Sequence, residues 1–187
     1  MSLKDSFLQD LIHHRVRTEK TIEHLNECSM PTPYGDFRLV SYQDVIDNEL
    51  HLALVLGDIK ADEATLIRVH MQNTLCDLFA STHADCGWPL QKAMQYVGEA
   101  GAGVIVVLRN HDTAREIVQR MRNYHMQDEN QQVEETPVDD KELRTFGVGA
   151  QILADLGVRK MRVMSSPMSL HALSGFDLEV VEYVNYK

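Results

Sequence analysis

The chain has 187 residues, of which 44% are hydrophobic and 25% are charged, and this is the composition of a soluble globular protein long enough to bury one sizeable core. With 28 acidic and 18 basic residues, the net charge is −10 at pH 7, which weighs against nonspecific binding to nucleic acid or to an anionic membrane. No apolar run approaches the roughly 18 residues of a membrane span, and the N-terminus lacks the apolar core of a secretory signal. We therefore expect a cytoplasmic protein.

The first 30 residues differ in character from the rest. Apolar residues recur at broadly helical spacing over residues 3–27, on a surface that is otherwise charged or rich in histidine. Such a helix cannot bury a wide stripe against its own domain. The pattern predicts that residues 1–30 form a helical linker or arm, and that residues 31–187 form the domain.

Turn-forming residues at positions 31–36 introduce the first strand-like segments. Three runs rich in β-formers follow at residues 37–42, 51–59 and 64–70, with short polar segments between them. This spacing predicts antiparallel hairpins.

Strand and helix alternate in the second half of the chain. A helix is predicted to start near Pro89 and to end at Gly101, and the apolar run 103–109 is typical of a buried strand. Two further helices are predicted at residues 113–127 and 141–157, with an exposed polar loop between them at residues 128–140. Two further strands are predicted at residues 160–166 and 177–184. The expected class is α/β, with N-terminal antiparallel hairpins leading into a mixed sheet flanked by helices.

The stretch "RVHMQNTLCDLFASTHADCGWPL", residues 68–90, holds two of the three cysteines and two histidines. An odd number of cysteines, in a chain that needs no covalent staples, argues against a disulfide framework and favours reduced thiols or a metal site. A zinc site using Cys76, Cys86 and either His70 or His83 is chemically acceptable. The alternative is that the cysteines are small buried apolar residues.

Six segments together resemble GTP cyclohydrolase II, the zinc enzyme that opens the guanine ring of GTP in riboflavin synthesis: "PTPYGDFRLVSYQD", "HLALVLGDI", "RVH", "DCGWPLQKAM", "YHMQD" and "ILADLGV". The resemblance runs from about residue 30 to the end. The preceding arm resembles the connector that, in bifunctional riboflavin proteins, follows an N-terminal 3,4-dihydroxy-2-butanone 4-phosphate synthase. The resemblance thus implies that synthase domain as the partner, and we expect a homodimer.

The resemblance also implies a metal site in residues 68–90. In the family, three cysteines of this segment bind zinc and leave a fourth position for the attacking water. Aligned without a gap, the first two cysteines fall on Asn73 and Ala84, and only the third falls on Cys86. We therefore expect no catalytic zinc, whereas an active enzyme would need a rearranged zinc site and magnesium for the phosphates. Arg68 and His70 are kept as candidate nucleotide contacts.

Other nucleotide-contacting motifs of the family are changed. Its Glu-Gly-Arg segment falls on His111, Asp112 and Thr113, so a short hydroxyl replaces an arginine that could grip phosphate with two parallel hydrogen bonds. The lysine that follows the family's Thr-Asn-Asn-Pro segment has no counterpart after Pro167. These changes predict weakened recognition of GTP.

Three catalytic positions of the family retain a suitable residue. Its Asp-x-Arg pair aligns with Glu142 and Arg144, and its tyrosine aligns with Tyr124. A glutamate can still move protons, although it reaches further than an aspartate. The alternatives are a solvated ion pair and a tyrosine that serves packing.

Three functions are compatible with these residues. The first is a domain that has lost catalysis and has a structural or regulatory role for a fused synthase. The second is an active GTP cyclohydrolase II with a rearranged zinc site. The third is a sensor that binds a nucleotide or metabolite without reacting with it. The joint loss at the metal, purine and phosphate positions favours the first, because a fold can outlive its site.

Overall fold

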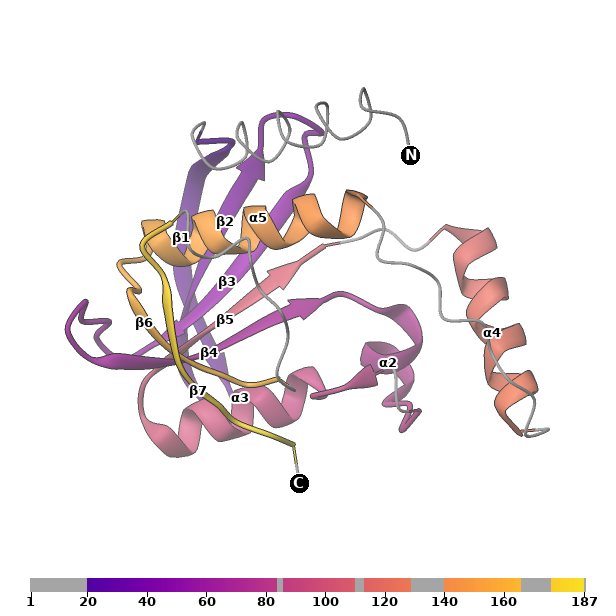
Figure 1. Ribbon diagram of the computed structural model, residues 1–187. Helices are drawn as coiled ribbons and strands as arrows, with labels where there is room; N and C mark the ends of the chain where they lie inside the picture. The colour runs from indigo at the N-terminus through magenta and orange to yellow at the C-terminus, as the bar shows by residue number, and fades with distance from the viewer. Residues whose placement is uncertain (1–19, 84–85, 110–112, 129–139, 166–175, 187) are drawn as a thin grey trace.

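The computed structural model describes residues 20–83, 86–109, 113–128, 140–165 and 176–186. Seven strands form one mixed sheet, in the order β1-β2-β3-β5-β4-β6-β7 (Figure 1). The strands are β1 Ile22–Thr32, β2 Gly35–Asp44, β3 Leu50–Leu56, β4 Ala64–Met71, β5 Gly103–Leu108, β6 Lys160–Val163 and β7 Glu179–Tyr183. The described helices are α2 Thr74–Phe79, α3 Leu90–Ala100, α4 Ala114–Asp128 and α5 Asp140–Asp155. None of these helices has the length and apolar character to cross a bilayer.

The first three strands form an antiparallel meander, which confirms the predicted turn before residue 37. The prediction of a helix is wrong for residues 22–27, and residues 22–30 belong to the sheet rather than to an arm. They form β1, which pairs with β2 from Ile22 opposite Asp44 to Thr32 opposite Gly35. Long-range pairing has overridden a local helical spacing of apolar residues. Residues 1–19 lie outside the described part.

The predicted hairpin between the second and third runs is wrong, because β5 lies between β3 and β4. It pairs antiparallel with β3 and parallel with β4. The physical reason is its composition: Val104, Ile105 and Val106 are fully buried, so this strand is most stable in the middle of the sheet. The parallel β4–β5 pair requires a crossover, which contains α3.

Helices cover both faces of the sheet, with α5 on one side and α3 on the other (Figure 1). Alternate residues of β5 therefore enter different clusters. Val104 and Val106 pack with Ile152 of α5, whereas Ile105 packs with Val97 of α3. The α/β class with a mixed sheet is thus confirmed, and its core lies in two apolar layers.

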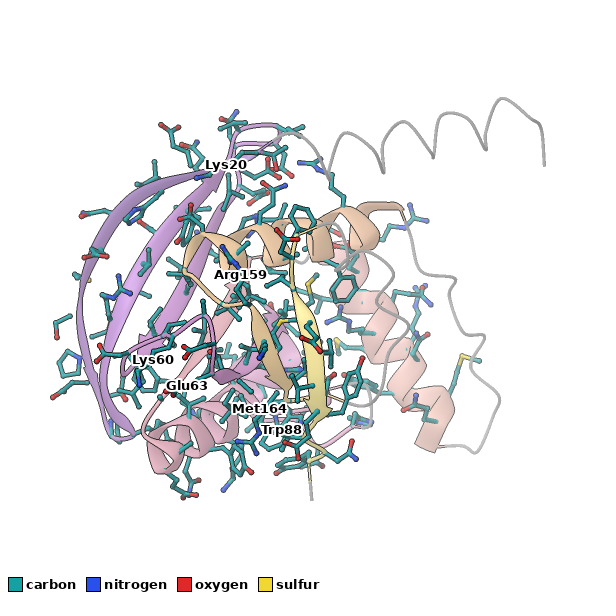
Figure 2. The ribbon with its side chains drawn as sticks, turned by 60° about the vertical axis from the view of Figure 1, so that its left-hand side comes forward. Lys20, Lys60, Glu63, Trp88, Arg159 and Met164 are labelled. Carbon is teal, nitrogen blue, oxygen red and sulfur yellow. A yellow bond between two sulfur atoms is a disulfide. The ribbon has the colours of Figure 1, made fainter. Side chains whose placement is uncertain are left out.

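The predicted helix after Pro89 is confirmed, since Pro89 is the N-cap of α3 and Gly101 ends it with φ +77°. Just before this helix, Trp88 is buried and its Nε1 donates to the carbonyl oxygen of Val184 at 3.2 Å. Figure 2 shows Trp88 close to Met164, with which it shares the core layer on the α3 side. The segment that enters α3 is therefore firmly attached to the C-terminal part of the sheet.

Candidate functional site

The candidate site lies where β4 and β5 end. These strands are parallel, so their carboxyl ends meet at the same edge of the sheet, and α2 and α4 follow them there (Figure 1). Arg68 and His70 stand near the end of β4, opposite Ile105 and Val107 of β5. The two candidate nucleotide contacts therefore share the sheet face that α3 covers further along.

A short helix that the sequence analysis missed follows β4. The side chain of Asn73 accepts hydrogen bonds from the backbone N–H groups of Leu75 and Cys76, and this N-cap starts α2. Ala80 ends the helix in the left-handed region, with φ 52°. An asparagine before an apolar run is the signal that would have predicted it. Asn73, which the resemblance aligns with the family's first zinc cysteine, thus caps a helix.

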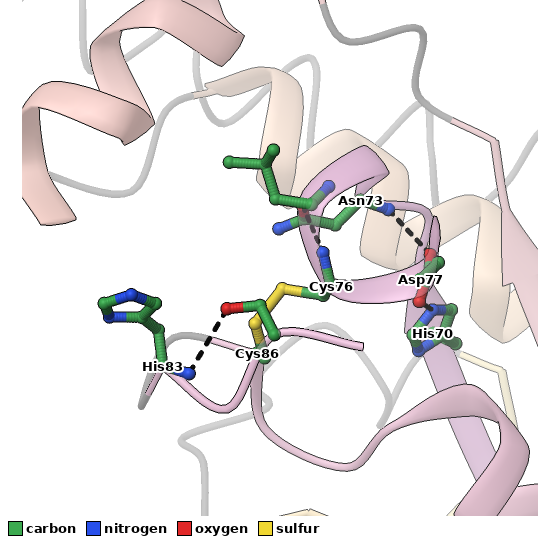
Figure 3. The surroundings of a disulfide bond; sticks show 8 residues. His70, Asn73, Cys76, Asp77, His83 and Cys86 are labelled. Carbon is green, nitrogen blue, oxygen red and sulfur yellow. Dashed lines mark hydrogen bonds and ion pairs between the residues drawn. A yellow bond between two sulfur atoms is a disulfide. The ribbon is translucent and has the colours of Figure 1, made fainter. Parts of the chain in front are cut away.

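Cys76 and Cys86 are joined by a disulfide, with 5.5 Å between their Cα atoms (Figure 3). The prediction of reduced thiols is therefore wrong for this pair. The odd number of cysteines is explained by Cys28, which is exposed on β1 and outside the bond. The other two pair because α2 places Cys76 next to Cys86. Both bonded cysteines are buried.

His70 is held by Asp77 of α2 rather than by a metal ligand set. Its Nε2 donates to Asp77 Oδ1 at 2.8 Å, and the backbone N–H of Asn73 donates to Asp77 Oδ2 at 2.9 Å (Figure 3). Burial by itself would raise the pKa of Asp77. The hydrogen bonds from His70 and Asn73 and the charge of Arg68 outweigh it, so the pKa lies below its usual value.

Arg68 is partly buried and lies close to Gly87, the residue that follows Cys86. Burial lowers its pKa to about 10 against the opposing charge of Asp77, so the guanidinium remains protonated at neutral pH. One terminal nitrogen donates to the carbonyl oxygen of Met164 at 3.0 Å. Within the described structure, Arg68 Nε and His70 Nδ1 are buried atoms without a hydrogen-bond partner. Among the described residues, the Nε–H of Arg68 is thus an unused donor, and Nδ1 of His70 is an unused acceptor because Nε2 carries the proton.

Tyr124 of α4 is brought to the loop after α2. Its ring stacks on that of His83, with 3.6 Å between centroids and 4° between planes. His83, a candidate metal ligand, thus packs against Tyr124, a candidate catalytic residue. In the described part of the chain, no three His, Cys, Asp or Glu side chains come together to hold a metal ion. With both sulfurs in a disulfide, the donor set does not match the three thiolates that the resemblance implies.

Arg144 is engaged in ion pairs at the turn between β2 and β3. Its Nη2 lies 2.7 Å from Asp44 Oδ2 and 2.9 Å from Asp47 Oδ2, and Asp44 is only 1% exposed. No motif in the sequence singled out these aspartates, which lie about 100 residues before Arg144 in the chain. Glu142 lies on the same helix, α5, but its side chain is outside the described part, as are His111, Asp112 and Pro167.

Close to this ion pair, His51 is a second buried histidine that the sequence analysis did not single out. Its Nδ1 accepts a hydrogen bond from the backbone N–H of Arg109 at 3.2 Å. Burial lowers its pKa, although the charges of Asp44, Asp47 and Glu49 oppose the shift. The ring is therefore neutral at pH 7, and the bond to Arg109 fixes its tautomer.

The sequence model of GTP cyclohydrolase II matches residues 23–185. The chain belongs to the GTP cyclohydrolase II family. It is 37% identical to "Riboflavin biosynthesis protein RibBA" of Chlorobium phaeovibrioides, covering 98% of this chain and 47% of that protein. It is 40% identical to a "3,4-dihydroxy-2-butanone 4-phosphate synthase" of Pseudomonas aeruginosa, and the match covers 97% of this chain and 48% of that protein.

A solved structure also resembles this chain. It is the crystal structure of RibBX, a two-domain 3,4-dihydroxy-2-butanone 4-phosphate synthase from A. baumannii, with a TM-score of 0.63 and 34% identity over 96% of this chain and 45% of that one. The chain spans about half the length of the relatives it matches. The family predicted from the motifs is therefore confirmed, and several of the relatives are named as riboflavin biosynthesis proteins.

Proposed function

We propose that this GTP cyclohydrolase II-like domain does not hydrolyse GTP and instead has a structural or regulatory role for a 3,4-dihydroxy-2-butanone 4-phosphate synthase domain. We place it in the cytoplasm and as a homodimer. One observation carries the proposal: Cys86, at the one zinc position that still holds a cysteine, is bonded to Cys76. A sulfur in a disulfide is not a thiolate, so the oxidised protein cannot hold zinc through it, and in the reduced protein Cys86 is still the one cysteine at the three aligned zinc positions.

The position of Arg144 also supports lost catalysis. Two carboxylates already neutralise its guanidinium, and one of them, Asp44, is buried. A nucleotide phosphate would have to replace these partners and leave Asp44 without its cation, which is costly for a buried charge. The retained arginine therefore serves the fold in this arrangement.

The relatives support the partner. Several proteins that match almost this whole chain over about half of their own length are named for 3,4-dihydroxy-2-butanone 4-phosphate synthase alone. A domain of this fold thus occurs in proteins named for another activity. This favours a supporting role over an independent enzyme.

The first test measures zinc content and GTP turnover, with and without a thiol reductant and with zinc and magnesium added. We expect far less than one zinc per chain and no release of formate or pyrophosphate. The matched control restores the two missing cysteines through Asn73→Cys and Ala84→Cys, and removes the disulfide partner of Cys86 through Cys76→Ser. This variant should bind about one zinc per chain. Stoichiometric zinc together with turnover in the wild type would contradict the proposal.

The second test concerns the synthase. In the Pseudomonas aeruginosa relative, the half that matches this chain is either deleted or replaced by this chain, and synthase activity and thermal stability are compared. We expect deletion to lower one or both, and replacement to restore them. If deletion changes neither, the supporting role is wrong. Sedimentation of this chain alone tests the homodimer.

A second candidate function, a sensor of a nucleotide or another anionic metabolite, is favoured by the buried, unpartnered Nε–H of Arg68. A guanidinium with an unused donor can bind an anion without any catalytic group. Ligand-dependent thermal stabilisation without turnover would support it. The absence of any shift across purine nucleotides and intermediates of the riboflavin pathway would remove it.

A further inference from the structure

The disulfide connects the two segments that hold Arg68 and His70 in place. Next to Cys76, Asp77 accepts the hydrogen bond from His70. Next to Cys86, Gly87 faces Arg68, because a Cβ added there would lie 3.7 Å from Arg68 Nη2. Figure 3 shows this disulfide beside Asp77 and His70. The bond therefore connects the residue that holds His70 to the segment that lies against Arg68.

The bond lies in a part of the structure that can open locally. α2 has six residues, too few to be stable without packing. Its last two residues, Leu78 and Phe79, are 72% and 69% exposed, so they add little burial. Small elements with few buried apolar contacts open at low free-energy cost. Such an opening would expose the sulfurs of Cys76 and Cys86 to an incoming thiolate.

We propose that Cys76 and Cys86 form a reversible redox site which, in its disulfide form, holds α2 and the Gly87 segment over Arg68 and His70. The proposal rests on the cytoplasmic location in the proposed function, since disulfides in reducing compartments are usually transient and redox-sensing or catalytic. The co-reactant is a dithiol reductant of the thioredoxin class.

The exchange proceeds in two balanced steps. A thiolate of the reductant attacks one sulfur, the Cys76–Cys86 bond breaks, a mixed disulfide forms, and the other cysteine leaves as a thiolate that takes a proton. The second thiolate of the reductant then attacks the mixed disulfide and releases the remaining cysteine, which also becomes a thiol. Two electrons pass from the reductant, which ends as a disulfide, to the protein, which ends with two thiols.

The chain offers a matched control and an internal probe. Cys28 is exposed and outside the bond, so Cys28→Ser should leave the redox behaviour unchanged. Trp88 is the single tryptophan and lies two residues from Cys86, so its fluorescence reports on this segment. Alkylation of folded protein should count one thiol per chain when oxidised and three when reduced.

The main experiment titrates the native full chain with reduced and oxidised dithiothreitol, then with a thioredoxin-class protein. We expect reversible reduction without global unfolding, a change in Trp88 fluorescence, and hydrogen exchange of α2 amides faster by about tenfold or more, with β5 unchanged. The midpoint temperature of unfolding should fall by several degrees, since the unfolded chain loses a constraint. Cys76→Ser/Cys86→Ser should match the reduced protein, but the wild-type titration suffices if this variant does not fold.

A further measurement tests the link to His70. Asp77→Asn should lower the midpoint temperature of the oxidised protein by more than that of the reduced protein, because the carboxylate moves with α2 when the disulfide opens. Resistance of the folded protein to the reductants would overturn the proposal. Reduction that leaves α2 exchange and the Asp77→Asn effect unchanged would overturn it as well. GTP turnover would contradict the proposed function and leave these redox results standing.

Discussion

The centre of the sheet and the edge where β4 and β5 end are built on different principles. In the centre, Val104 to Val106 are fully buried between two helices, and the packing is apolar on both faces. At the edge, Arg68, His70 and Asp77 form a polar group beside a disulfide and an exposed helix end. The fold depends on the first region, so the second can lose a catalytic arrangement while the family remains recognisable.

The largest expected effect tests the central region. Ile105→Ala removes a fully buried side chain from the α3-side layer, and should reduce the free energy of unfolding by about 3–4 kcal/mol. Phe79→Ala, at the exposed end of α2, should change it by less than about 0.5 kcal/mol. Urea denaturation of both variants measures the difference. Equal effects would contradict the division into a stabilising core and a dispensable edge.

An intermediate effect is expected at Arg144, which the sequence predicts as a catalytic candidate and the structure places in an ion pair. Arg144→Met leaves the buried Asp44 without its cation and should cost about 1–3 kcal/mol, less than for a fully buried pair because the arginine is 29% exposed. Asp47→Asn, at the 39% exposed partner, should cost less than about 0.5 kcal/mol.

The double variant Asp44→Asn/Arg144→Met tests whether the loss in Arg144→Met comes from the unpaired charge of Asp44. It should recover part of the loss, because no buried charge then lacks a counter-ion. Unfolding free energies of the two single variants and the double variant give the coupling. No loss in Arg144→Met would mean that the arginine is kept for something other than the fold.

The smallest expected effect depends on pH. The folded state holds the pKa of Asp77 below its usual value of 3.8, so its ionised form stabilises the fold at pH values above that. Asp77→Asn should therefore be less stable than the wild type by roughly 1 kcal/mol at pH 7. The gap should shrink as pH falls below about 4, through the folded-state pKa.

Denaturation at pH 7, 5 and 3 measures this gap. Asp58→Asn, at an exposed aspartate, is the control and should show little difference at any of these values. A gap for Asp77→Asn that stays constant from pH 7 to pH 3 would show that the loss comes from geometry rather than from the carboxylate charge.

The sequence predicted much of the fold because local signals agreed with the final structure. Pro89 and Gly101 bound α3, the β-branched run of β5 is central, and strands and helices alternate as expected. The prediction was wrong where pairing over distance decided, as in residues 22–27 of β1 and in the insertion of β5 between β3 and β4. Local spacing carries no information about which strand lies next to which.

By itself, the sequence determined the family, since the family motifs can be read from residue identity and order, and it predicted that two of the three zinc cysteines are missing. Only the tertiary structure decided that Cys76 and Cys86 are bonded, that Asp44 and Asp47 neutralise Arg144, and that Tyr124 stacks on His83. Each of these contacts depends on how separate elements are placed in space. The fate of a site residue depends on those neighbours as much as on its identity.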